Sequence, residues 1–137
     1  MVRAERWAVA ATLGLALGVA CAGPRYEPYP LQLRAELPAD AFDRCRAELL
    51  RSYGGLAVAD PDRFLLQSGW TPSDEPVGER RASVFRSEDA RDLAVVVEFR
   101  WLTTPWFGLP HWTSARGDDA AERELAEALR TALTAAR

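Results

Sequence analysis

The stretch LAVVVEFRW at residues 93–101 constrains the fold more than any other part of the chain. Large apolar residues occupy every second position, and glutamate, arginine or smaller apolar residues stand between them. Because successive side chains of a strand point to opposite faces, this alternation predicts a strand with one face on a core and one in water. The residues predicted to face the core are Leu93, Val95, Val97, Phe99 and Trp101.

Three further strands are predicted upstream of this one, from alternation between turn-forming residues. In the first strand Leu56 and Val58 alternate with smaller residues. The second strand has Phe64, Leu66, Ser68 and Trp70 on one face. The third strand spans residues 80–87, where Ala82 and Val84 share a face. The sequence Asp60-Pro61-Asp62 marks a turn between the first two strands. Since most of the connections are short, the four strands are expected to form an antiparallel meander.

Two amphipathic helices flank the predicted strands. The first, at residues 39–55, has Asp40 as its expected N-cap and Gly54 or Gly55 as its stop. Its apolar stripe recurs at helical spacing and consists of Phe42, Cys45, Leu49 and Tyr53. This places Cys45 in the core. The second helix spans residues 118–137, begins at Asp118, and has an apolar face of Leu125, Ala128, Leu129, Ala132 and Leu133.

The first 20 residues have the order of a secretory signal. Arg3 and Arg6 precede an uncharged, mostly apolar run of fourteen residues, 7–20. A membrane-spanning helix needs about 20 apolar residues, and here Pro24 and Arg25 follow almost at once. A cleaved signal peptide is therefore preferred to a permanent membrane span.

The residues GVAC at 18–21 resemble the lipobox of bacterial lipoproteins, in which small residues precede a cysteine. The match departs from the usual pattern at Gly18, where leucine is common. The resemblance implies that Cys21 carries a diacylglycerol, that the leader is cut before it, and that the new amino terminus is acylated with a fatty acid such as palmitate. The alternative is an ordinary secretory signal cut near Ala20 or Ala22. In lipoproteins of enteric bacteria, an aspartate directly after this cysteine tends to hold the protein at the inner membrane. Cys21 is followed by Ala22, so the resemblance implies the outer membrane, with the protein facing the periplasm.

The expected organisation is a signal peptide at 1–20, a lipidated cysteine and proline-rich tether at 21–39, and one domain at 40–137. Prolines at 24, 28, 30 and 38 resist helix and predict a semi-extended connection. Within the domain, the order helix, four strands, helix predicts an α+β fold, a two-layer sandwich whose apolar sheet face is covered by both helices.

This order resembles that of small, mostly uncharacterised envelope lipoproteins of bacteria. The residues that carry the resemblance are the first helix with its following strands (AFDRCRAELLRSYGGLAVADPDRFLLQSGW), the meander RRASVFRSEDARDLAVVVEFRW and the closing helix. The pattern is also similar, more distantly, to the helix-grip domains in the accessory lipoprotein of the β-barrel assembly machinery. By implication the chain is a non-enzymatic envelope component.

The residue types give little support to catalysis or to a metal site. His111 is the only histidine, and zinc sites use three or four ligands. Ser114, His111 and Asp118 could be combined into a triad only on paper, since no nucleophile elbow is present. We therefore expect no enzyme activity, no metal and no cofactor. The net charge of −3, with scattered arginines, argues against nucleic-acid binding.

The segment TTPWFGLPHWTS at 103–114 combines loop-forming prolines and glycine with large apolar side chains. The favoured interpretation is that its aromatic residues fold back and cover the end of the core beside Trp70 and Trp101. The alternative is that Trp106, Phe107 and Trp112 face outward as a docking patch for an envelope protein or lipid, because tryptophan is frequent at binding hot spots and membrane interfaces.

The preferred function is a lipid-anchored structural or protein-interaction module of the envelope. Two alternatives stay open: a binder of a lipid or small apolar ligand between sheet and helices, and a secreted periplasmic protein without an anchor.

Overall fold

A computed structural model describes residues 27–73, 77–87 and 92–135 of the 137-residue chain. Residues 1–20 and Cys21, with the predicted signal and lipidation site, lie outside the described residues. In the described part, two helices, α1 (Ala41–Tyr53) and α2 (Asp119–Thr134), pack against an antiparallel sheet. No helix among the described residues is long and apolar enough to cross a membrane.

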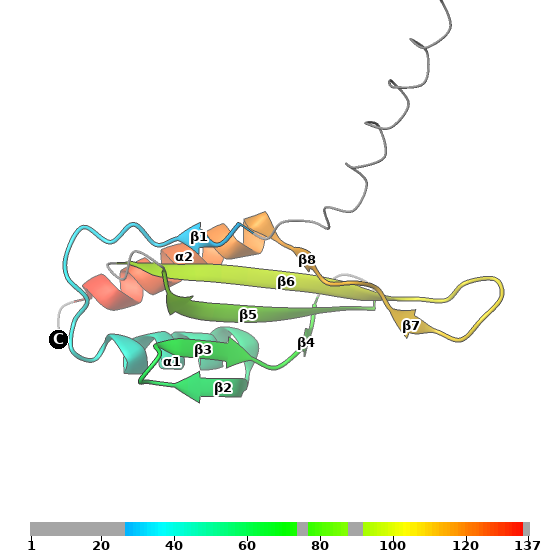
Figure 1. Cartoon of the computed structure of the whole chain (residues 1–137), viewed down its shortest axis with the longest axis horizontal. Helices are drawn as coiled ribbons and strands as arrows, with labels where there is room; N and C mark the ends of the chain where they lie inside the picture. The colour runs from blue at the N-terminus through cyan, green and yellow to red at the C-terminus, as the bar shows by residue number, and fades with distance from the viewer. Residues whose placement is uncertain (1–26, 74–76, 88–91, 136–137) are drawn as a thin grey trace, which may run out of the picture.

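The centre of the sheet is formed by its two longest strands, β5 (Gly78–Arg86) and β6 (Leu93–Thr103). They pair without interruption from Gly78 opposite Trp101 to Arg86 opposite Leu93. On the far side of β5, β3 (Leu65–Ser68) pairs with β5 and β2 (Leu56–Asp60) pairs with β3. Figure 1 shows these strands side by side, with β5 and β6 reaching well past β2 and β3.

The predicted four-stranded, two-layer sandwich is wrong, because the described residues form a sheet of eight strands. The four additional strands have two residues each: β1 (Tyr29–Pro30), β4 (Thr71–Pro72), β7 (His111–Trp112) and β8 (Arg116–Gly117). Three of them pair with β6 and one with β5. A two-residue strand is too short to show alternation, and it forms here because the long strands leave backbone groups available for pairing.

Both helices begin and end close to the predicted positions. Gly54 ends α1 in the left-handed conformation, with φ 75° and its N–H bonded to the Leu50 carbonyl, as predicted. Asp118 caps α2 by accepting a hydrogen bond from the Ala121 N–H at 3.1 Å, also as predicted. Asp40 precedes α1, but its carboxylate makes no cap hydrogen bond and instead accepts from Arg44 Nε at 2.9 Å.

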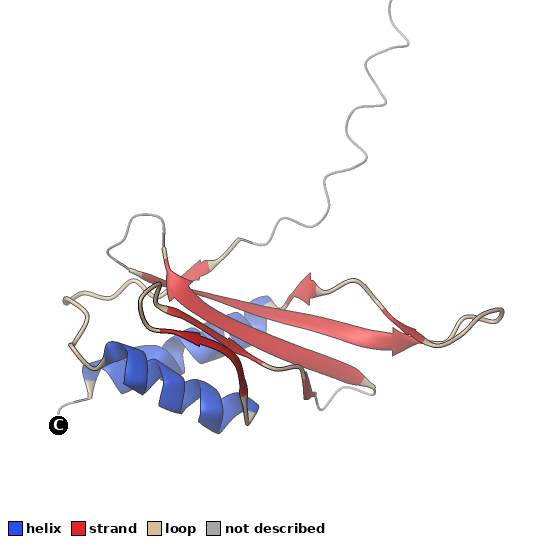
Figure 2. Ribbon diagram, turned by 60° about the horizontal axis from the view of Figure 1, so that its bottom comes forward, coloured by secondary structure: helices blue, strands red, loops and turns tan. Residues whose placement is uncertain are grey.

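The core lies between the helices and one face of the sheet, as Figure 2 shows. Leu93, Val95 and Val97 of β6 are fully buried, which confirms their predicted direction. Phe99 and Trp101 are only partly buried, because β6 continues past the region that the helices cover. The buried residues of the two helices are Ala41, Cys45, Leu49, Glu122, Leu125, Ala126, Leu129 and Leu133.

Cys45 is fully buried, as predicted. Burial, with a smaller contribution from the nearby Glu48 carboxylate, raises the pKa of its thiol to about 12. At neutral pH the thiol is therefore protonated and unreactive, which suits a structural residue.

The proline-rich segment, expected to be a tether, contributes residues to the domain in its described part. Tyr29 and Pro30 pair with Val95 and Ala94 of β6. Leu31 is fully buried in the core, and its N–H donates to the Leu93 carbonyl at 2.8 Å. Its carbonyl accepts from Arg130 Nε of α2 at 2.7 Å. This segment therefore ties the first described residues to both β6 and α2.

Candidate functional site

The aromatic arm, residues 102–113, is the feature of the structure that extends farthest from the core. β6 passes the end of β5, and its last residues, Leu102 and Thr103, pair with Trp112 and His111 of β7. A loop of seven residues, 104–110, closes this two-stranded ribbon and is called the hairpin tip below. Figures 1 and 2 show the arm projecting beyond the ends of both helices.

Three large apolar side chains are exposed at the hairpin tip. The exposed fractions are 97% for Trp106, 93% for Phe107 and 85% for Leu109. The favoured expectation that Trp106 and Phe107 fold back onto the core is therefore wrong, and the alternative direction is the observed one. The reason is geometric: the β6–β7 ribbon carries the loop past the ends of the two helices that cover the core.

The base of the arm is fixed to the sheet by hydrogen bonds. The Trp101 N–H donates to Thr113 Oγ1 at 3.1 Å, and the Thr113 N–H donates to the Trp101 carbonyl at 2.9 Å. On the other side, the Leu102 N–H donates to the Val77 carbonyl at 3.0 Å. These bonds make the arm a continuation of the sheet, so the exposure of the tip follows from ordered structure.

Trp112 belongs to the base of the arm and is 39% exposed. The Arg100 guanidinium lies between two rings, 4.7 Å from the Trp112 centroid and 4.0 Å from that of Trp70. Arg81 covers Trp70 at 4.6 Å. The structure thus separates the three residues named from the sequence: Trp106 and Phe107 lie at the tip, and Trp112 stacks on Arg100.

The arginines of this stack are held by carboxylates across the strands. Arg100 pairs with Glu79 at 2.6 Å, and Arg81 pairs with Glu98 at 2.6 Å. At partly exposed sites an ion pair contributes about 0.2–1 kcal/mol and a cation–π contact about 0.5–1 kcal/mol. Together they stiffen the outer face of β5 and β6 where the arm begins.

The sequence does not predict the stack, because the alternation places Trp70 on the same face of its strand as Leu66 and Ser68. β3 ends at Ser68, so the alternation does not continue to Trp70. Opposite charges in the two long strands are the sequence signal that could have indicated the stack. The register of these strands places Glu79 opposite Arg100 and Arg81 opposite Glu98.

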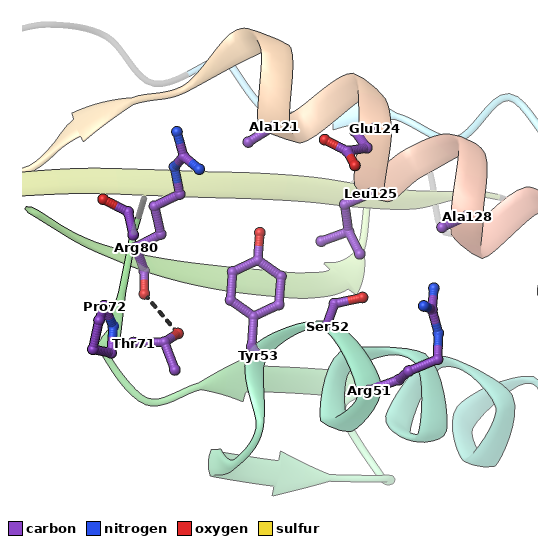
Figure 3. Close-up of a pocket in the computed structure, with 11 residues that line it drawn as sticks. Arg51, Ser52, Tyr53, Thr71, Pro72, Arg80, Ala121, Glu124, Leu125 and Ala128 are labelled. Atoms are coloured by element: carbon purple, nitrogen blue, oxygen red, sulfur yellow. Dashed lines mark hydrogen bonds between the residues drawn. The ribbon is translucent and has the colours of Figure 1, made fainter. Parts of the chain in front are cut away.

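A second candidate is a pocket of about 460 Å³ between the end of α1, the start of β5 and α2, drawn in Figure 3. The Tyr53 side chain points into it, and burial raises the pKa of its hydroxyl to about 12. The pocket was not predicted. Its lining is largely polar, and the residues are Arg51, Ser52, Tyr53, Thr71, Pro72, Ser73, Arg80, Ala121, Glu124, Leu125 and Ala128.

Both arginines that line this pocket are paired with carboxylates of the domain. Arg80 Nε lies 2.9 Å from the Asp118 carboxylate, and Arg51 pairs with Glu48 on its own helix. The lining therefore does not offer the continuous apolar wall that a lipid chain needs, nor a free cationic centre for an anion.

The histidine and the aspartate that could be combined into a catalytic triad lie in different elements, and each has a structural role. His111 lies in β7, exposed, with Nδ1 3.2 Å from the Leu109 carbonyl oxygen. Asp118 caps α2 and pairs with Arg80. Within the described ranges, no group of three or more histidine, cysteine, aspartate or glutamate residues is arranged to hold a metal ion.

The chain matches no protein-family model, no curated protein and no solved structure.

Proposed function

We propose that this chain is a lipid-anchored, non-enzymatic protein of the bacterial envelope that acts as a structural or interaction module, with the hairpin tip as its contact surface. The observation that carries the proposal is the exposure of Trp106, Phe107 and Leu109 at the end of an ordered arm. Exposed apolar clusters of this kind mark contact sites, since water is an unfavourable neighbour for them.

The proposed anchor is Cys21. Two or more acyl chains hold a protein to a bilayer stably, whereas one holds it only marginally. Because Tyr29 is already part of the sheet, the connection from Cys21 spans at most about 28 Å. A lipidated Cys21 would therefore keep the folded domain close to the membrane surface.

We expect Cys21→Ala to abolish incorporation of radiolabelled palmitate into the chain in its bacterial host. The substitution removes the thiol that would receive the diacylglycerol, and without it the leader is not processed as a lipoprotein signal. Incorporation is measured by autoradiography of the immunoprecipitated protein.

Cys45→Ala is the matched control, because Cys45 is fully buried and offers no thiol for acylation. The labelled band should persist in this variant. A labelled band that survives Cys21→Ala, or an unlabelled wild-type protein, would contradict the anchor.

A further inference from the structure

We infer that the hairpin tip inserts into the interfacial layer of a phospholipid bilayer. This inference rests on the proposed function, in that it names the partner of the contact surface. The tip would give the domain a membrane contact that is separate from the lipid on Cys21.

The size of the tip favours a bilayer over a protein. A stable protein–protein interface buries about 800 Å² on each partner. The tip offers three apolar side chains, and a large aromatic side chain buries only about 150–250 Å². Such a small, convex cluster is insufficient for a typical protein interface, but it suits shallow insertion, in which lipid closes around the side chains from all sides.

The charge of the arm is compatible with an anionic lipid surface. The chain contains 20 acidic residues, yet none lies between Glu98 and Asp118. Within the arm itself, residues 102–113, the only ionisable side chain is the exposed His111. The exposed Arg116 lies just beyond the base of the arm, and Arg100 at the base is paired with Glu79. Basic residues near a membrane surface are attracted to anionic headgroups, and carboxylates would be repelled.

The residue types at the tip also fit the interfacial layer. Tryptophan is enriched where the apolar interior meets the headgroups. Pro105 and Pro110 flank the apolar side chains and carry no backbone N–H, so fewer donors lose water when the tip enters the lipid. Gly108 has φ 136°, a conformation that favours glycine and closes the loop tightly between the prolines.

Because the arm is anchored to the sheet, a contact between the hairpin tip and the membrane also orients the domain. Because Trp101 and Thr113 bond each other across the ribbon, the tip cannot move far without the sheet. Insertion of the tip therefore fixes the direction of the long strand β6 relative to the membrane, in addition to adding affinity.

The test uses depth-dependent fluorescence quenching on the full chain carrying Cys21→Ala. An environment-sensitive dye is attached to Thr104→Cys, the exposed first residue of the hairpin tip. Cys45 is not labelled, because it is buried and its pKa is about 12. Vesicles contain phosphatidylethanolamine and phosphatidylglycerol, with a nitroxide quencher placed on the acyl chain just below the headgroups.

We expect strong quenching of the dye, and at least a roughly fivefold loss of quenching in the double variant Trp106→Ser, Phe107→Ser. Both rings are exposed, so the double variant should retain the melting temperature of the parent. The matched control carries the dye at Arg63→Cys, in the exposed turn between β2 and β3 at the opposite end of the sheet, and should show little quenching.

Equal quenching with and without the two rings would overturn the inference, as would equal quenching at positions 104 and 63. Absence of quenching at position 104 would also overturn it and would leave a protein as the partner of the tip. Because every sample lacks Cys21, none of these outcomes depends on whether that residue is lipidated. Failure of the palmitate experiment is thus distinguishable from failure of this one.

Discussion

Replacing Leu31 with alanine is expected to lower the free energy of unfolding by about 2–5 kcal/mol. Leu31 is fully buried and packs in the same core as α2 and β6. Its removal leaves a cavity that the surrounding backbone cannot fill, because the Leu31 N–H and carbonyl are both held by hydrogen bonds. The measurement is equilibrium unfolding in urea, followed by circular dichroism.

The matched control is Leu50→Ala on the exposed side of α1, where the side chain is 40% exposed. We expect this change to cost no more than about 0.5 kcal/mol beyond the small difference in helix propensity. If Leu31→Ala unfolds at the same urea concentration as the wild type, residues 27–38 do not belong to the folded domain and act only as a tether.

Replacing Glu122 with alanine is expected to cost about 1–3 kcal/mol. Glu122 is only 4% exposed, and its carboxylate accepts a hydrogen bond from the buried Val97 N–H at 3.0 Å. Alanine leaves that donor without its partner in the interior. Glu122→Gln retains an oxygen acceptor and should cost clearly less. The same urea unfolding assay measures both variants.

The pH dependence of this site has a definite sign. Burial, together with Asp119 and Asp118, raises the pKa of Glu122 above its ordinary value of 4.5, against the opposing effect of the Val97 hydrogen bond. The folded state therefore holds the proton more tightly than the unfolded state. The resulting stabilisation is complete below pH 4.5 and is lost as the pH rises through the folded-state pKa.

Glu122→Gln has no proton to lose, so its stability relative to the wild type should increase from acidic to neutral pH. Glu127→Gln is the control, since Glu127 lies on the same helix with 71% of its side chain exposed. A constant difference between Glu122→Gln and the wild type across this pH range would contradict the raised pKa.

The long elements could be predicted because their patterns repeat several times. The helix expected at 118–137 is observed as α2, and the alternation at 93–101 correctly gave the direction of Leu93, Val95 and Val97. Each of these patterns rests on one continuous buried face, so several residues support the same interpretation.

The short strands could not be predicted, which is why the four-stranded interpretation failed. β1 and β7 have two residues each and form because the edge of β6 offers them hydrogen-bond partners. Leu31 follows β1 directly, so its burial could not be inferred either, because the prolines around it predict a semi-extended tether. These residues pair with a strand edge that lies far away in the sequence, so the local sequence does not indicate the pairing.

The direction in which the aromatic arm projects also could not be predicted from the sequence. Hydrophobicity favours burial for Trp106 and Phe107, and only the length of the β6–β7 ribbon shows that they lie out of reach of the core. Trp112 differs because Arg100 lies beside it at the base of the arm. The composition of the loop thus indicates a possible docking site, whereas only the three-dimensional structure shows that its side chains are exposed.

The most direct test of the central claim places a photoreactive benzophenone side chain at position 107 in the protein expressed in its bacterial host. After irradiation of intact cells, we expect the purified chain to gain the mass of a phospholipid. The same group at position 63 serves as the control and should gain none. Adducts with protein alone, or phospholipid adducts of equal yield at both positions, would contradict the account.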